Sequence, residues 1–213
     1  FTRRYPLIEL DLRLNDRIVD LVAERVDVAL RVGPIRQAGL AARRVSQVNI
    51  VTCAAPAYLQ DHGEPKTPDD LREHRLVGLT SPSGAPPEWT FPPPYTPKRL
   101  GLKFAMLFNS AEAPIIAATA GLGITHTGDL LVAEYVGRGE LKLILEDFVL
   151  PGPPISLVYP SAGHQLAKVR VFSDFAADLL LRWNVEVRRW IKQPPRLPAP
   201  VSARLAQDPR EPT

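Results

Sequence analysis

The 213 residues supply enough chain for one large domain or two small ones, and a composition of 45% hydrophobic and 23% charged residues is typical of a globular protein. The formal net charge of +3 is spread along the chain without a long basic cluster, which argues against a DNA-binding face in this sequence. One cysteine, Cys53, excludes an internal disulfide and a cysteine metal site, and no apolar run reaches the roughly 20 residues of a membrane-spanning helix.

Residues 8–33 predict a strand, a helix and a second strand. Residues 8–14 alternate apolar and polar side chains, which is typical of a half-exposed strand. Asn15 is a suitable N-cap for a helix, and residues 27–33 predict the next strand. The two strands should be parallel and joined by a right-handed crossover. The helix between them has apolar residues at helical spacing: Ile18, Leu21, Val22 and Val26.

The rest of the chain continues to alternate strands and helices. Gly63 terminates a short helix that begins near residue 55, and Thr67 followed by Pro68 starts another. A third helix begins at Asn109 and a long amphipathic helix at Leu166. Further strands are predicted at residues 40–45, 49–55, 75–80, 100–110, 121–127 and 155–161. Proline-rich residues 81–97 predict a loop and hairpin, and the polar chain after about residue 192 is predicted to be disordered.

This alternation indicates an α/β fold with mostly parallel sheets. The strand–helix–strand pattern occurs once before about residue 76 and again around Asn109. The chain can therefore form two similar lobes with a cleft between them.

Polar residues that follow strands are the best candidates for a binding site. In open α/β sheets, ligands bind beyond the carboxyl ends of the strands, where helix N-termini present free N–H groups. Two candidates have a second explanation: Asn109 as a helix cap with Glu112 closing a capping box, and Arg31 as a solvated or salt-bridged strand end. The candidates are Arg31, Val32, Gly33, Ser81, Ser83, Asn109, Ser110, Thr125, His126 and Thr127.

No catalytic or metal-binding motif is present in the sequence. None of the four histidines is spaced with another histidine or a carboxylate as a metal pair would be. Ser110, His126 and Asp129 can be written as a catalytic triad, but any chain of this length yields such triples. We therefore expect no catalytic residue, no metal and no cofactor.

Several stretches of the chain together closely resemble the effector-binding domain of LysR-type transcriptional regulators. They are RYPLIELDLRLNDRIVDLVAERVDVALRVG, LAARRV, CAAPAYLQDHGEPKTPDDLREH, NSAEAPIIAATAGLGIT, VGRGELKLILEDF and ISLVYPSAGHQLAKVRVFSDFAADLL. The likeness runs from about Arg4 to Leu181, and the stretches agree in order and spacing.

The resemblance implies two Rossmann-like lobes of the periplasmic-binding-protein type (type 2), between which the chain crosses twice. Lobe I would comprise residues 1–76 and 162–184, lobe II residues 77–161, and residues 185–213 would be a C-terminal extension. A small metabolite, usually an organic acid, would bind between the lobes and shift their arrangement. Where the family often has a proline soon after the GLGI strand, this chain has Thr125, His126 and Thr127.

The resemblance also implies partners. Family members associate as homodimers or homotetramers, and Ile18, Leu21 and Val22 are candidates for that interface, although burial in the core of the same chain explains them equally well. DNA would be bound only through an N-terminal winged helix-turn-helix, which this sequence lacks together with the first strand of the domain. The resemblance implies a cytoplasmic location and no membrane partner.

Three functions follow from these observations. The first is the ligand-sensing part of a bacterial transcription regulator, with the helix from Asn109 presenting its N-terminus to a bound anion. The second is a solute-binding protein of a transporter, which has the same two-lobed form. The third is an enzyme on the same fold, for which loss of activity in His126→Ala without loss of ligand binding would be the supporting result.

Overall fold

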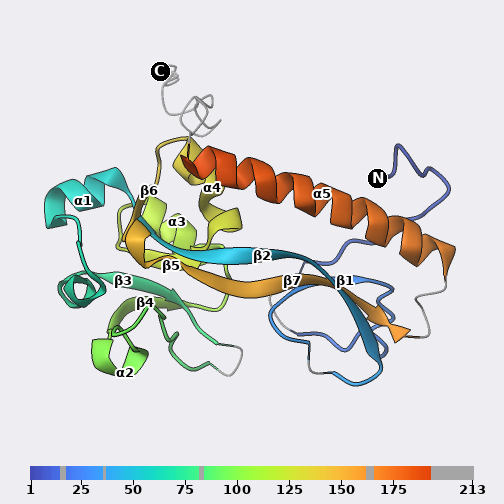
Figure 1. The fold of residues 1–213 in the computed structure, drawn as a ribbon, viewed down its shortest axis with the longest axis horizontal. Coiled ribbons are helices and arrows are strands. Elements are labelled where there is room, and N and C mark those ends of the chain that lie inside the picture. The colour runs from blue at the N-terminus through green and yellow to red at the C-terminus, as the bar shows by residue number, and fades with distance from the viewer. Residues whose placement is uncertain (15–17, 36, 82–83, 162–165, 193–213) are drawn as a thin grey trace, which may run out of the picture.

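The computed structural model describes residues 1–14, 18–35, 37–81, 84–161 and 166–192, and the side chains of these residues up to residue 187. A long curled sheet runs through the molecule with one long helix beside it (Figure 1). The strands are β1 (Ala29–Val32), β2 (Leu40–Ala54), β3 (Leu76–Leu79), β4 (Phe104–Phe108), β5 (Thr125–Gly128), β6 (Lys142–Ile144) and β7 (Leu150–Pro160). The helices are α1 (Pro56–His62), η1 (Pro68–Glu73), α2 (Pro97–Leu100), α3 (Ala113–Thr119), α4 (Asp129–Gly137), η2 (Glu146–Phe148) and α5 (Ala167–Lys192).

Strand β2 is the centre of the larger sheet, whose order is β1-β7-β2-β5 with β6 pairing to the far end of β2. The two strands predicted at residues 40–45 and 49–55 are one strand of 15 residues, interrupted by register shifts between Arg44 and Ser46 and between Gln47 and Asn49. The first half of β2 therefore connects to β1 through β7, and the second half pairs with β5 and β6.

The expectation of mostly parallel sheets is wrong for the larger sheet. All four of its pairings are antiparallel, whereas β3 and β4 form a parallel pair. Strands β2 and β7 run side by side in opposite directions over most of their length, and a strand–helix–strand count cannot reveal such long-range pairing. The pair β3 and β4 is joined to the start of β5 by a bridge between Leu76 and Ile124.

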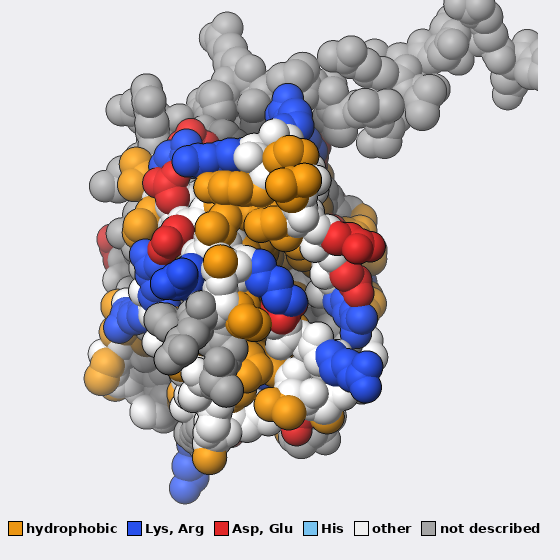
Figure 2. Space-filling model, turned by 90° about the vertical axis from the view of Figure 1, so that its right-hand side faces the viewer, with side chains coloured by type: hydrophobic (Ala, Val, Ile, Leu, Met, Phe, Trp, Pro, Cys, Tyr) orange, Lys and Arg blue, Asp and Glu red, His pale blue; other side chains and the backbone are white. Residues whose placement is uncertain are grey.

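The strand and helix expected over residues 8–26 are also not formed. Residues 8–14 are not in a strand, residues 21–25 form a turn, and residues 15–17 lie outside the described part. An alternating pattern fixes which side chains a strand would bury, but the strand forms only where a neighbour supplies hydrogen bonds. Exposed hydrophobic side chains are numerous in this segment, namely Leu10, Leu12, Leu14, Ile18 and Val22, and beside it at Leu7, Leu30 and Val32. Figure 2 shows hydrophobic side chains at the surface on the end of the molecule where this part of the chain lies.

Local signals located α1 and η1 correctly. Helix α1 ends at Gly63, whose φ of 81° lies in the region that favours glycine. The turn η1 begins after Thr67, whose backbone N–H donates to Asp70 at 2.9 Å. Residues 81–97 contain no hairpin in their described part, and α2 begins at Pro97 instead.

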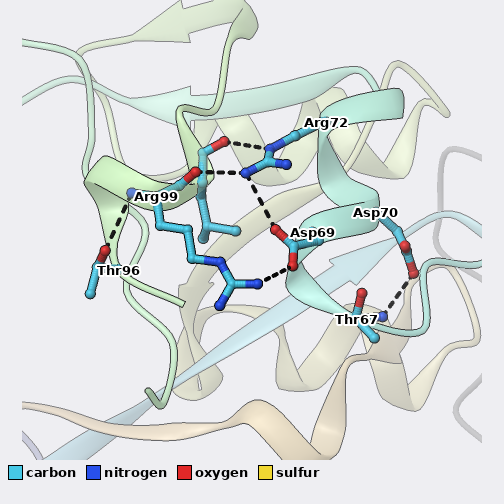
Figure 3. Close-up of polar contacts among 7 residues, drawn as sticks. Thr67, Asp69, Asp70, Arg72, Thr96 and Arg99 are labelled. Carbon is cyan, nitrogen blue, oxygen red and sulfur yellow. Dashed lines mark hydrogen bonds and ion pairs between the residues drawn. The ribbon is translucent and has the colours of Figure 1, made fainter. Parts of the chain in front are cut away.

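Arg72 joins η1 to α2 (Figure 3). Its Nε donates to the Leu100 carbonyl at 2.8 Å and its guanidinium donates to the Arg99 carbonyl at 2.6 Å, so it satisfies carbonyls that the last turn of a helix leaves free. Asp69 pairs with both Arg72 and Arg99, at 3.3 and 2.9 Å. This cluster stabilises the packing of the two short helices.

The buried residues form three clusters. The largest packs Tyr58, Leu71 and Leu76 against Trp89 and Leu100, so it includes residues on both sides of the expected lobe boundary at residue 76. The second lies between β2, β6, α3 and α4. The third lies under α5 and contains Val45, Val48, Ile155, Leu157 and Ala177.

Candidate functional site

Strands β2 and β7 cross together from the end of the molecule that carries β1 to the end that carries β5 and β6 (Figure 1). We call residues 44–50 of β2 and residues 150–156 of β7 the crossover. Both register shifts of β2 lie in it, and such bulges bend a strand. Gly152 permits the close approach of the two strands, because a Cβ at that position would lie 2.8 Å from Ile50 side-chain atoms.

The first group of candidate residues lies at the end of β1, beside the crossover. The Gly33 N–H donates to the carbonyl of Pro154 at 2.9 Å, which fixes the end of β1 against β7. Arg31 donates to the Gln37 side-chain oxygen at 2.9 Å and to the Val19 carbonyl, both of which are neutral acceptors. Among the described residues no carboxylate forms an ion pair with Arg31.

The second group, residues 125–127, forms most of β5 on the other side of the crossover. Thr127 is opposite Val51 of β2, whereas Gln47 of β2 is opposite Pro154 of β7. Four residues of extended strand span about 13 Å. Strands β7 and β2 therefore both lie between β1, which carries Arg31, and β5.

His126 is held inside the protein by two aromatic rings and a threonine. Its ring centroid is 5.1 Å from that of Trp89 and 4.7 Å from that of Phe91, and its Nδ1 is 2.9 Å from Thr52 Oγ1. Burial lowers the pKa of His126 to about 4, an effect that the nearby Thr90 carbonyl partly opposes. The imidazole is therefore neutral near pH 7, and its buried Nε2 has no hydrogen bond of normal geometry within the described residues.

The remaining candidates lie at the ends of the parallel pair β3 and β4. Thr80 donates its N–H to the Phe108 carbonyl at 2.7 Å, so Ser81 and Asn109, the next residues along each strand, lie at the same edge. The Ser81 hydroxyl accepts from the Ala85 N–H at 3.1 Å. Ser110 follows Asn109 in a bend before α3, and Ser83 lies outside the described residues.

The prediction that Asn109 caps a helix is wrong. Helix α3 has Glu112 at its N-cap and begins at Ala113, with Pro114 in its first turn. Proline lacks an N–H and is suited to the first turn, so it places the start of the helix after Ser110. The capping box with Glu112 is therefore not formed, and α3 is only seven residues long.

The written triad of Ser110, His126 and Asp129 is not assembled. The Asp129 carboxylate is 2% exposed and accepts from the Asn49 N–H at 3.0 Å, the Asn49 side-chain amide at 2.8 Å and the Leu130 N–H at 2.9 Å. These bonds orient it toward β2 and the first turn of α4, whereas His126 bonds to Thr52.

Sequence reasoning missed the polar side chains that fasten the crossover. Gln47 donates to the Gly152 carbonyl at 2.9 Å, Asn49 binds Asp129, and Asn184 of α5 donates to the Gln47 carbonyl at 3.4 Å. Nothing in their local sequence marks them, because each partner lies far away along the chain.

The two cavities described in the structure lie elsewhere. One of about 340 Å³ is lined by Pro56, Val136, Gly139, Leu141, Lys142, Leu143 and Glu146. The other, of about 260 Å³, is next to Leu21 and Val22. None of the ten candidate binding residues lines either cavity.

Of the three interface candidates, Ile18 is 73% exposed and Val22 66% exposed, while Leu21 is 1% exposed. No group of acidic, histidine or cysteine side chains in the described part is arranged to hold a metal ion. No helix in the same part is both long and apolar enough to cross a bilayer.

Comparison with known proteins places this arrangement in a family. The family model for the LysR substrate binding domain matches residues 1–180. The HTH-type transcriptional regulator YhjC of Escherichia coli K12 is 32% identical over 193 residues, covering 84% of this chain and 60% of YhjC. The HTH-type transcriptional regulator PtxR of Pseudomonas aeruginosa PAO1 is 31% identical over 182 residues, covering 85% of this chain and 58% of PtxR. The chain thus spans about three fifths of the length of these relatives.

A solved structure agrees with the sequence comparison. The regulatory domain of CrgA, a LysR-type transcriptional regulator from Neisseria meningitidis, is similar with a TM-score of 0.76 and 29% identity, over 84% of this chain and 87% of that one. This likeness confirms the predicted fold class, the α/β fold of type 2 periplasmic-binding proteins.

Proposed function

The chain belongs to the family of LysR substrate-binding domains, and from that premise we propose that it senses a small organic acid between its two lobes and regulates an attached DNA-binding part. Its relatives are transcription regulators and not enzymes or transport proteins. As the regulatory part of such a protein, it acts in the cytoplasm, as a homodimer or homotetramer.

Arg31 is the observation that carries the choice of an acid. Its guanidinium binds only neutral oxygens among the described residues, and it stands at the end of β1 next to the crossover. A guanidinium that lacks a carboxylate partner is suited to bind one from a ligand, in a charge-assisted and often bidentate contact.

His126, Thr127 and Gly33 supply the neutral side of the proposed site. The buried Nε2 of His126 has no hydrogen bond of normal geometry among the described residues, which supports a hydrogen-bonding role for this neutral side chain. Ser81, Asn109 and Ser110 remain candidates for the edge of the site, at the ends of β3 and β4.

The boundaries of the lobes remain a prediction. The packing of Leu71 and Leu76 with Trp89 supports moving the first boundary from residue 76 into the crossover part of β2. The pairing of residues 155–158 with β1 supports moving the second from residue 161 into β7. Residues 185–192 would then be the end of α5 and not the beginning of a separate extension.

The exposure of Ile18 and Val22 supports a role for residues 18–22 in the interface between protomers, whereas Leu21 is better explained as a core residue. The self-association of the chain, measured by sedimentation with and without Val22→Lys, tests this assignment. Loss of self-association in the variant supports it, and unchanged self-association places the interface elsewhere.

A thermal-shift screen of the 213-residue chain tests the proposed function. The panel contains aromatic acids, aliphatic acids, amino acids and sugars. A ligand at a hundred times its dissociation constant adds about 2.7 kcal/mol, which raises Tm by about 5 to 10 °C for a domain of this size.

Two arginine variants make the screen specific. Arg31→Gln should abolish the stabilisation by an acid, whereas Arg170→Gln, an exposed arginine on α5, should retain it. A stabilising acid that acts equally on all three proteins would remove Arg31 from the site, and stabilisation by sugars alone would contradict the proposed ligand class.

A further inference from the structure

Helix α5 spans the crossover and contacts both ends of the molecule. It has 26 residues, which corresponds to about 39 Å of helix. Near its start, Lys168 pairs with Asp27 at 2.7 Å, and one turn and a half later Asp174 pairs with Arg43 at 2.6 Å. Figure 1 shows the helix lying along β2 and β7 from the end with β1 toward α4.

The middle of α5 covers an apolar cluster built from both sides of the crossover. Ala177 packs with Ile155 and Leu157 of β7, which pair with β1. The same cluster includes Val48 of β2 and, at its edge, Leu130 of α4. A rotation of one lobe against the other would therefore have to separate side chains that α5 now holds together.

Asn184 binds α5 to the bulged part of β2. Its amide donates to the Ser46 hydroxyl and to the Gln47 carbonyl, the latter at 3.4 Å. Ser46 and Gln47 pair with Ile155 and Pro154 of β7, and a register shift interrupts the ladder on each side of them, at Val45 and at Val48. Hinges consist of a few residues that absorb a change in backbone angles, and bulged residues that lack a regular ladder are suited to that role.

We propose that Asn184 is a positioning residue: by tying α5 to Ser46 and Gln47 across the hinge, it sets the angle between the two lobes and so controls how the inter-lobe site responds to its ligand. This inference rests on the proposed sensing function for its biological meaning, but not for its geometry. The pairs Gln47–Gly152 and Asn49–Asp129 fasten β2 to β7 and α4, whereas Asn184 connects the hinge to a helix that contacts both lobes.

The inter-lobe distance tests this inference without any ligand. Spin labels are attached at Ala42→Cys in the lobe I part of β2 and at Gln60→Cys on α1, both exposed positions, and the distance is measured by double electron–electron resonance. Cys53 does not compete for the label, because burial raises the pKa of its thiol to about 12 and keeps it unreactive.

Asn184→Ala should broaden the distance distribution and add a second, more open arrangement. Loss of one net hydrogen bond changes a two-state equilibrium by about fivefold to tenfold, so the open population should rise by that factor. Arg182→Ala is the matched control, because its side chain is 65% exposed and pairs only with Asp178 of the same helix among the described residues. It should leave the distribution unchanged.

An unchanged distribution in a folded Asn184→Ala protein would overturn the inference, and so would equal broadening in Arg182→Ala. If Asn184→Ala does not fold, Ser46→Ala is measured instead, because it removes one acceptor of Asn184 and keeps the helix intact. A broader distance distribution in Ser46→Ala supports the hinge contact, and an unchanged distribution refutes it. Failure of every acid to bind would remove the sensing function while leaving the distance result valid.

Discussion

The Asp129 carboxylate accepts three hydrogen bonds in a site where only 2% of the residue is exposed, and two of them come from Asn49 in the crossover. Asp129→Ala removes all three acceptor contacts and leaves the Asn49 N–H and side-chain amide without them. A buried donor left unsatisfied costs about 1 to 3 kcal/mol. We expect a loss of about 3 to 5 kcal/mol in the free energy of unfolding, since the two Asn49 donors and the Leu130 N–H all lose their acceptor and β2 can relax only partly.

Urea denaturation followed by circular dichroism measures this loss. Asp178→Ala is the control, because that carboxylate is 65% exposed and its ion pair on the surface of α5 contributes less than about 1 kcal/mol. Asp129→Asn, which keeps one acceptor oxygen, should lie between the two. A loss of less than about 1 kcal/mol for Asp129→Ala would refute the reasoning, because it would mean that Asn49 finds other partners.

Three further changes test other contacts. Gly152→Ala should destabilise by about 1 to 3 kcal/mol in urea titrations because its Cβ would lie 2.8 Å from the Ile50 side chain, and a cost that persists undiminished with Ile50→Ala would contradict that clash. The pKa of His126 in the folded protein, about 4, is below its ordinary value of 6.5, so protonation of this histidine favours the unfolded chain. The free energy of unfolding should therefore fall by about 3 kcal/mol as the pH drops from 6.5 toward 4. If the free energy of unfolding of His126→Gln depends on pH as strongly as that of the wild type, His126 is not the cause. Arg72→Met should lower the free energy of unfolding by about 1 to 2 kcal/mol, because the Leu100 and Arg99 carbonyls lose their donor. An unchanged urea midpoint would show that water hydrogen-bonds these carbonyls as well as Arg72 does.

The elements that local sequence determines were predicted correctly. Gly63 ends α1 and the Thr67–Pro68 pair starts η1, because a left-handed glycine and a first-turn proline act within a few residues of where they stand. Pro114 carried the same kind of information about the start of α3. The expected cap at Asn109 was wrong because more weight was given to a polar residue four positions before the helix start than to this proline.

The elements that depend on distant partners could not be predicted. Residues 8–14 have the alternation of a strand but no neighbouring strand in the described part of the chain. The antiparallel pairing of β2 with β7 joins residues that are a hundred or more positions apart. The polar contacts of the crossover have the same origin: Asn49 and Asp129 are 80 positions apart, and Gln47 and Asn184 are 137 apart.

The candidate binding residues were predicted as a set of strand ends, and the structure has Ser81 beside Asn109 and Gly33 beside β7. The strand-end rule could not indicate that Trp89 and Phe91 enclose His126, because burial by a proline-rich loop depends on tertiary packing. The central claim is that candidate residues on both sides of the crossover bind one ligand together.

An NMR titration of the ¹⁵N-labelled chain with the acid found in the thermal-shift screen tests that claim most directly. The account predicts that the amide signals of Gly33 on one side of the crossover and of Thr127 on the other shift together, with one dissociation constant. Shifts confined to one side of the crossover, or to residues around the cavity lined by Leu141 and Glu146, would contradict a site between the lobes.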